Sequence, residues 1–208
     1  QRYYVGAVCL FTIDPYQDSV TRTSTAKAEF NYTWNRQIIL EGELNYFFKA
    51  EKWFLGSNIH YSKYPDQYFG IGARTLESDG VYFQSNRFKL DVELSKQIRP
   101  KVFFGGGIRY FNYSNIGALS DTVALHAELT NFSDIELKAD LFKDDRDRIL
   151  TPTKGSFYKL TAGINYANSY YLHLLVDARK YYSFGKKENN VFAARFLQTS
   201  TAVSYTHL

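Results

Sequence analysis

Arg87-Phe88-Lys89-Leu90-Asp91-Val92-Glu93-Leu94-Ser95 alternates charged or polar side chains with apolar ones at every position. Successive side chains of a β-strand point to opposite faces, so this stretch predicts a strand with one apolar and one wet face. The pattern extends over Tyr82–Ile98, which is longer and more regular than an ordinary soluble hairpin needs. The stretch therefore favours a strand that crosses a bilayer with a polar lumen on its other side.

The same period of two recurs along the chain, and it predicts about ten strands. Most of them reach the roughly 9–11 residues that a tilted strand needs to cross the bilayer core. The predicted fold class is all-β, a transmembrane antiparallel β-barrel, with a soluble β-sandwich as the alternative. We expect the strands at Arg2–Thr12, Arg22–Trp34, Ile38–Phe48, Trp53–Lys63, Tyr82–Ile98, Val102–Asn112, Ser133–Asp145, Ser156–Ala167, Tyr170–Ser183 and Asn190–Thr201.

The connections between these strands differ in length, as they do in outer-membrane barrels. Short links are expected at Asn35–Gln37, Ala50–Lys52, Arg99–Pro100 and Asn168–Ser169. Longer connections are expected at Tyr64–Asp79 and Asn115–Asn131. Aromatic residues gather near the strand ends, where two interfacial girdles of a barrel would lie; they include Tyr46, Phe47, Phe48, Trp53, Phe54, Tyr166, Tyr170 and Tyr171.

The composition excludes several other classes of protein. The 208 residues include 18 Tyr and 17 Phe, which suits strands with one apolar face. The net charge of +4 is scattered without a Lys/Arg run, so no nucleic-acid partner is expected. The single Cys9 excludes a disulfide framework, and no apolar run is long enough for a transmembrane helix. No signal peptide and no Met are present, so we expect a mature or truncated N-terminus.

No pattern of catalytic, metal-binding or cofactor-binding residues stands out, so we expect no metal, no cofactor and no enzyme activity. The four histidines (His60, His126, His173 and His207) are not at ligand spacing. A hydrolase would need His173 beside Ser156 or Ser183, which the sequence does not bring together. No helix follows Gly105-Gly106-Gly107 or Gly70-Ile71-Gly72, so these glycines predict strand bends or a close approach of strands rather than phosphate loops.

One segment between two strands, Asp144–Gly155, reads D-x-R-D-x-x-x-x-P-x-x-G. Pro152 fixes a turn φ, and Gly155 can supply a positive φ where the next strand begins. Asp144, Arg146 and Asp147 can pair charges and bond the turn amides in a wet barrel mouth. The three carboxylates of Asp144, Asp145 and Asp147 lack the spacing of a calcium loop. The segment is therefore interpreted as a structural turn.

This motif, followed by Ser156-Phe157-Tyr158-Lys159-Leu160, resembles the barrel of the BamA/TamA family, also called the bacterial surface antigen family. A secondary motif, Tyr68, Gly70 and Gly72 after Pro65-Asp66, also looks like that family. The resemblance implies a sixteen-stranded barrel in the bacterial outer membrane, with this turn on the periplasmic side. It also implies contact with outer-membrane lipid and with unfolded outer-membrane protein clients.

The function that the resemblance implies is insertion and assembly of outer-membrane proteins, or polypeptide translocation. Two alternatives remain open: a passive pore or anchor barrel, and a barrel that exports a fused or upstream enzyme domain. We expect residues 1–201 to be part of the barrel domain. Residues 202–208 resemble translated adapter sequence, so we expect a non-native or truncated tail there.

Overall fold

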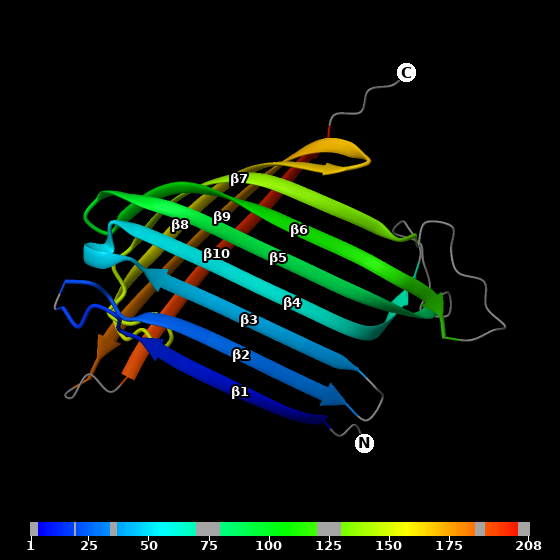
Figure 1. Ribbon diagram of the computed structural model, residues 1–208, viewed down its shortest axis with the longest axis horizontal. Coiled ribbons are helices and arrows are strands. Elements are labelled where there is room, and N and C mark those ends of the chain that lie inside the picture. The colour runs from blue at the N-terminus through cyan, green and yellow to red at the C-terminus, as the bar shows by residue number, and fades with distance from the viewer. Residues whose placement is uncertain are drawn as a thin grey trace.

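The computed structural model describes residues 4–18, 20–33, 37–69, 80–119, 130–185 and 190–203. These residues form one sheet in which every strand pairs antiparallel with the next strand along the chain (Figure 1). The fold is all-β, as predicted, and each of the expected strands is present, although the fourth and the sixth run to Tyr68 and Ala118 where Lys63 and Asn112 were the expected ends. The strands are β1 (Tyr4–Ile13), β2 (Ser24–Thr33), β3 (Ile38–Phe47), β4 (Trp53–Tyr68), β5 (Val81–Arg99), β6 (Val102–Ala118), β7 (Phe132–Asp144), β8 (Gly155–Ala167), β9 (Ser169–Phe184) and β10 (Asn190–Val203).

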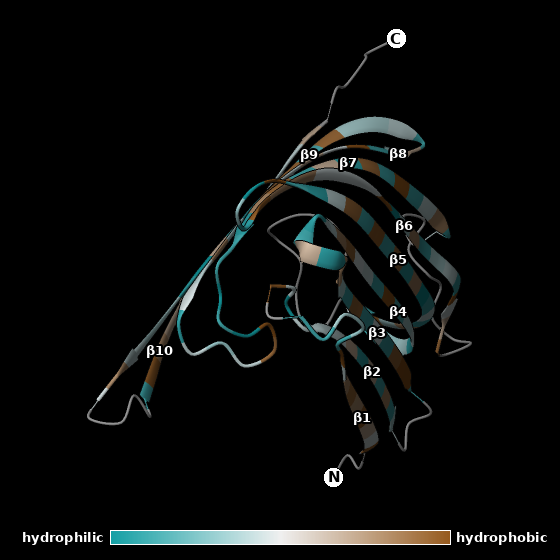
Figure 2. Cartoon of the chain, turned by 60° about the vertical axis from the view of Figure 1, so that its left-hand side comes forward, coloured by the Kyte–Doolittle hydropathy of each residue, from teal (hydrophilic) through white to brown (hydrophobic). Residues whose placement is uncertain are grey.

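The sheet is curved like part of a barrel wall, and it encloses a concave space (Figure 2). Within the described residues β1 and β10 form its two edges. The described ranges contain one short 3₁₀ helix, η1 (Lys49–Glu51), between β3 and β4. No helix in these ranges has the length and apolarity needed to span a membrane.

The concave face of the sheet is largely polar and its outer face is apolar. This is the reverse of a soluble protein, which has an apolar interior and a polar surface. On β7, Glu136 and Asp140 face the concave side and are 1% and 0% exposed. Leu137, between them, faces outward and is 68% exposed. The same holds on the neighbouring strands, where Ile164 and Leu172 are exposed on the outer face. An apolar outer face with a charged inner face is the arrangement of a transmembrane barrel, with the inner face lining the lumen.

Because the strands alternate in direction, the connections divide between two ends. One end carries the β1–β2, β3–β4, β5–β6, β7–β8 and β9–β10 turns; it is called the motif end because Asp144–Gly155 lies there. The opposite end carries the short β2–β3 and β8–β9 links and the two longest connections, β4–β5 and β6–β7. The two longest connections are shorter than predicted, because β4 pairs with β5 as far as Tyr68 and β6 pairs with β5 as far as Ala118. The rest of both connections includes residues 70–79 and 120–129, outside the described ranges.

The aromatic girdles are present in part. Trp53, Tyr158 and Tyr182 are exposed on the outer face near the motif end. Near the opposite end, Tyr166 and Tyr170 lie in contact with ring centroids 5.0 Å apart. The prediction was wrong for three of the girdle residues, whose place in the alternation directs their side chains into the lumen. They are Phe47, Phe54 and Tyr171.

The glycine triplet in β6 lies where strands approach closely, as predicted. Gly105 pairs with Ser95, and a Cβ on Gly105 would lie 2.1 Å from the carbonyl oxygen of Leu94. A Cβ on Gly107 would lie 2.2 Å from the carbonyl oxygen of Val92. Both glycines face the lumen, and their missing side chains allow the backbones of β5 and β6 to approach closely there.

Candidate functional site

The Asp144–Gly155 segment forms the turn between β7 and β8. Its base continues the strand pairing: the Asp145 amide donates to the carbonyl of Ser156 at 3.0 Å, and that of Asp147 to the carbonyl of Lys154 at 3.2 Å. The Asp145 carboxylate also accepts hydrogen bonds from the amide and the hydroxyl of Ser156. These bonds hold residues 148–153 as a compact loop on a narrow neck.

Asp144 is the buried anchor of this turn. Its side chain is 4% exposed and accepts bonds from Arg146, with Nε at 2.8 Å from Oδ1 and Nη2 at 3.0 Å from Oδ2. A second guanidinium, that of Arg22 in the β1–β2 turn, lies 3.1 Å from Oδ2. Arg22 also binds Glu51 of η1 at 2.8 Å. Asp144 therefore links β7 to the β1–β2 turn across the concave face. It is buried there, whereas the sequence predicted a solvated position at the opening of the barrel.

Arg146 turns back over the loop that it begins. Its guanidinium lies 4.8 Å from the centroid of the Phe157 ring and donates to the carbonyl of Ile149 at 3.4 Å. Arg179 of β9 lies over the same ring at 5.1 Å. Two cations therefore contact the Phe157 ring on the lumen wall.

Asp147 caps the far side of the loop. Its carboxylate accepts the Thr153 hydroxyl at 2.6 Å, the Thr153 amide at 2.9 Å and the Lys154 amide at 3.1 Å. Desolvation raises the pKa of Asp147, but these hydrogen bonds outweigh it and hold the pKa at about 2, below the ordinary 3.8. The charged form therefore stabilises the turn.

Asp147→Asn should make the free energy of unfolding vary less with pH in the acid range. A carboxylate with a lowered pKa contributes its full stabilisation above its ordinary pKa and loses it as the pH falls from about 4 to about 2. We expect urea unfolding of the full-length protein to separate wild type from Asp147→Asn at neutral pH, and this difference to shrink over that interval. A difference that stays constant down to pH of about 2 would contradict the role of the charged form.

Gly155 ends the turn with a φ of +104°. A Cβ there would lie 2.4 Å from the carbonyl oxygen of Asp145 and 2.8 Å from Cα of Arg146. Both the left-handed backbone and the lack of space require glycine. Pro152 lies half-buried in the loop, next to Thr153, whose carbonyl accepts the Ser183 hydroxyl of β9 at 2.7 Å.

Of the secondary motif, the structure describes Tyr68, which lies at the opposite end of the sheet. Tyr68 is the last residue of β4 and pairs with Val81. Gly70 and Gly72 lie outside the described residues. Tyr68 and the Asp144–Gly155 turn therefore lie at opposite ends of the wall.

The β7–β8 turn reaches across the lumen to the strands near the start of the chain. Ile149 and Phe157 pack against a buried cluster formed by Phe47 of β3, Phe54 of β4, Phe103 of β6 and Phe142 of β7. The rings of Phe103 and Phe142 stack with centroids 4.9 Å apart, and those of Phe54 and Phe142 meet edge-on at 5.3 Å. Contacts between strands so far apart in the sheet brace its curvature at the motif end. The four buried phenylalanines, Phe47, Phe54, Phe103 and Phe142, are called the Phe cluster.

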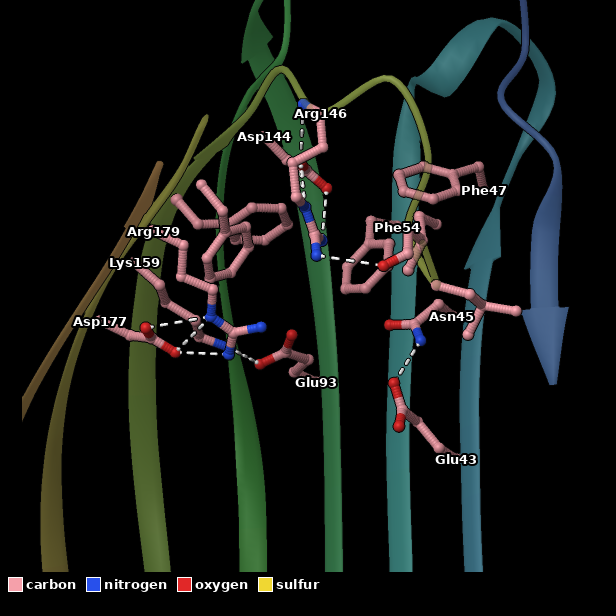
Figure 3. Close-up of a pocket in the computed structure, with 14 residues that line it drawn as sticks. Glu43, Asn45, Phe47, Phe54, Glu93, Asp144, Arg146, Lys159, Asp177 and Arg179 are labelled. Atoms are coloured by element: carbon pink, nitrogen blue, oxygen red, sulfur yellow. Dashed lines mark hydrogen bonds and ion pairs between the residues drawn. The ribbon is translucent and has the colours of Figure 1, made fainter. Parts of the chain in front are cut away.

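A cavity of about 420 Å³ lies beside the Phe cluster (Figure 3). Arg146 bends over Asp144 above it, while Lys159 reaches Glu93 and Arg179 reaches Asp177 on the wall (Figure 3). Phe47 and Phe54 lie on the other side. The cavity therefore combines cations, carboxylates and aromatic rings.

Away from the motif end, the lumen wall carries a network of paired charges. Arg109 of β6 bridges Asp91 at 2.7 Å and Glu136 at 2.6 Å, and Glu136 in turn binds His173 of β9 at 2.8 Å. The Glu136 side chain crosses β8 above Gly163, where a Cβ would lie 2.0 Å from its carboxylate oxygen. Lys138 and Lys159 complete the network with Asp91, Glu93 and Asp140. Buried charges persist because each has an opposite partner.

The structure does not assemble the hydrolase alternative. His173 binds Glu136, whereas the Ser156 hydroxyl binds Asp145 and that of Ser183 binds the carbonyl of Thr153. The carboxylates of Asp144, Asp145 and Asp147 point at different partners rather than at one centre. Among the described residues no group of three or more His, Cys, Asp or Glu side chains is placed to hold a metal ion.

Sequence reasoning missed the cross-lumen partners of the motif. Arg22 and Glu51 carry no local signal, because their roles depend on the curvature that brings the β1–β2 turn to β7. The lumenal orientation of Phe47 and Phe54 was available from strand parity. Ile149 resembles any apolar turn residue until its contact with the Phe cluster is known.

Comparisons with known proteins agree with this architecture. The Omp85 superfamily domain matches residues 16–206. Among solved structures, the fold is similar to that of BamA from Haemophilus ducreyi lacking POTRA domains 1-3, with a TM-score of 0.50 and 11% sequence identity. That likeness shows the shared fold, and it covers 98% of this chain but only 41% of that chain. No curated protein matches the sequence. The family match extends over most of the chain, which therefore belongs to the Omp85 superfamily of outer-membrane β-barrels.

Proposed function

We propose that this chain forms the wall of a barrel in the bacterial outer membrane that inserts barrel proteins or moves polypeptides across that membrane. The observation that carries the proposal is the Omp85 domain over residues 16–206. The lumen side of the motif turn supports it, because a cavity lined by cations, carboxylates and aromatic rings offers contacts to an extended chain. Unfolded outer-membrane proteins are the clients that this function requires.

Depletion of the full-length protein tests the assembly activity. We expect other outer-membrane barrel proteins to lose their folded form, measured as the fraction that migrates faster in unboiled than in boiled gel samples. A soluble periplasmic protein serves as the control and should keep its level. Normal folding of all barrel proteins after depletion would contradict insertion; loss of one exported polypeptide alone would identify translocation.

A passive pore is the second candidate, because paired charges line the lumen wall around Arg109 and Lys138. Such a lumen can hold water and ions. The refolded full-length protein in planar bilayers should then conduct steadily, and depletion should leave barrel assembly unchanged. A closed barrel would argue against this candidate.

A further inference from the structure

Exposed cations gather at the motif end. The acids there are mostly neutralised or buried: Glu51 and Asp144 bind arginines, and Asp145 lies 3.5 Å from Lys143. Among the described residues of this end, Asp14 and Asp147 are the exposed carboxylates. The exposed cations are Lys49, Lys52, Lys96, Arg99, Lys101, Arg148, Lys154 and Lys180, together with Lys143, whose charge Asp145 partly offsets. This end therefore presents an excess of positive charge.

Three of these lysines point to the outer face of the sheet. Lys96 follows Leu94 in the outward alternation of β5, Lys143 follows Leu141 in β7, and Lys180 belongs to the same face of β9. Their neighbours toward the middle of the sheet on this face are apolar: Leu94 and Leu141 are exposed, and Ala178 is half-buried. The three ammonium groups therefore border the apolar belt, whereas Lys101 and Lys154 lie in turns beyond the strand ends.

The register places the three lysines at one level of the barrel. The residues aligned with Lys96 across the sheet are Phe104, Leu141, Leu160 and Val176. Lys143 lies two residues closer to the motif end than Leu141, and Lys180 lies four residues closer than Val176. A constant step of this kind between strands is what the tilt of strands in a barrel requires of groups at one height.

Aromatic side chains stand beside these lysines. The Lys96 ammonium lies 5.9 Å from the centre of the Trp53 ring. Lys143 pairs with Tyr158, and Tyr182 follows Lys180 on the same face of β9. Amphipathic rings mark the depth of the lipid headgroups, and lysines at that depth can reach phosphates while their stems stay on the apolar belt.

We propose that Lys96, Lys143 and Lys180 form a binding surface for the phosphates of anionic phospholipids in the leaflet at the motif end. Charge complementarity favours an anionic partner, and continuity with the apolar belt favours a lipid over an acidic polypeptide. The proposal adds a lipid class and its ligands to the membrane contact that any barrel makes. It rests on insertion of the barrel in a membrane and not on assembly activity.

The test uses the full-length protein in vesicles of equal amounts of phosphatidylcholine and phosphatidylglycerol. Electron spin resonance with spin-labelled lipids gives the association constant of phosphatidylglycerol relative to phosphatidylcholine. We expect a ratio of about two or more for the wild type, and a ratio near one for K96Q/K143Q/K180Q. The matched control K49Q/K101Q/K154Q removes the same charge from the turns and should keep most of the preference.

Two results would overturn the proposal: a wild type without preference, or equal losses in both triple variants, which would indicate only the long-range field of this end. High salt provides a second measurement on the wild type alone, and it should remove the preference because surface ion pairs are screened. A preference that is insensitive to salt also contradicts the proposal. None of these readouts uses assembly activity, so failure here leaves the depletion experiment unaffected.

Discussion

Asp144→Ala should lower the free energy of unfolding of the full-length protein by about 3–5 kcal/mol, because removal of one partner leaves buried charges uncompensated. Asp144 is nearly fully buried, and two guanidinium groups depend on it, those of Arg146 and Arg22. Arg22 would keep Glu51, but Arg146 would keep only the Ile149 carbonyl and the Phe157 ring. The midpoint and slope of urea unfolding in lipid vesicles measure the loss.

Two controls separate this role from a general sensitivity of the turn. Asp147→Ala changes an exposed carboxylate of the same turn, so we expect a clearly smaller loss. Arg22→Ala combined with Asp144→Ala should cost less than the sum of the single changes, because the two side chains interact directly. Additive losses, or an Asp144→Ala protein as stable as the wild type, would show that the link across the lumen contributes nothing.

The same contacts show where sequence reasoning stops. The pairing of Asp144 with Arg146 and the capping by Asp147 were predictable, since both join residues of one turn. The contact between Asp144 and Arg22 was not, because it depends on how far the sheet curls between β1 and β7. Strand parity is local, whereas curvature is the sum of small angles over many strands. The strands could therefore be predicted from the sequence, but the contact between Asp144 and Arg22 across the lumen could not.

The ends of the strands are a second feature that the sequence predicts only in part. The alternation of Tyr82–Ile98 predicted β5 almost completely, whereas Tyr64–Tyr68 was assigned to a loop. That segment contains Pro65 and Asp66, which are poor strand formers. It nevertheless pairs with residues 81–85 because β5 is long and offers it a partner. Pairing with a neighbour outweighs local propensity here, and a single segment read alone cannot show this.

Gly105→Ala should lower the free energy of unfolding about as much as loss of the Asp144 carboxylate does, for a steric reason. A Cβ at this position would lie 2.1 Å from the Leu94 carbonyl oxygen and 2.4 Å from Cα of Ser95. These are backbone atoms of the paired strand, so neither can turn away as a flexible side chain can. Overpacking usually costs about 1–3 kcal/mol, and contacts with the backbone belong at or above the top of that range. The urea midpoint of the full-length protein measures the change.

Gly117→Ala is the matched control, because it lies on the same strand and nothing lies within 4 Å of an added Cβ. A methyl group there should leave the urea midpoint nearly unchanged. If both variants lost equal stability, the conformational freedom of glycine in β6 would matter rather than the close approach to β5. If only Gly105→Ala loses stability, the close approach of β5 and β6 depends on the missing side chain. Phe54 and Phe103 of the Phe cluster lie on strands separated by β5, so a displacement of β5 from β6 should also disturb the contact of their rings.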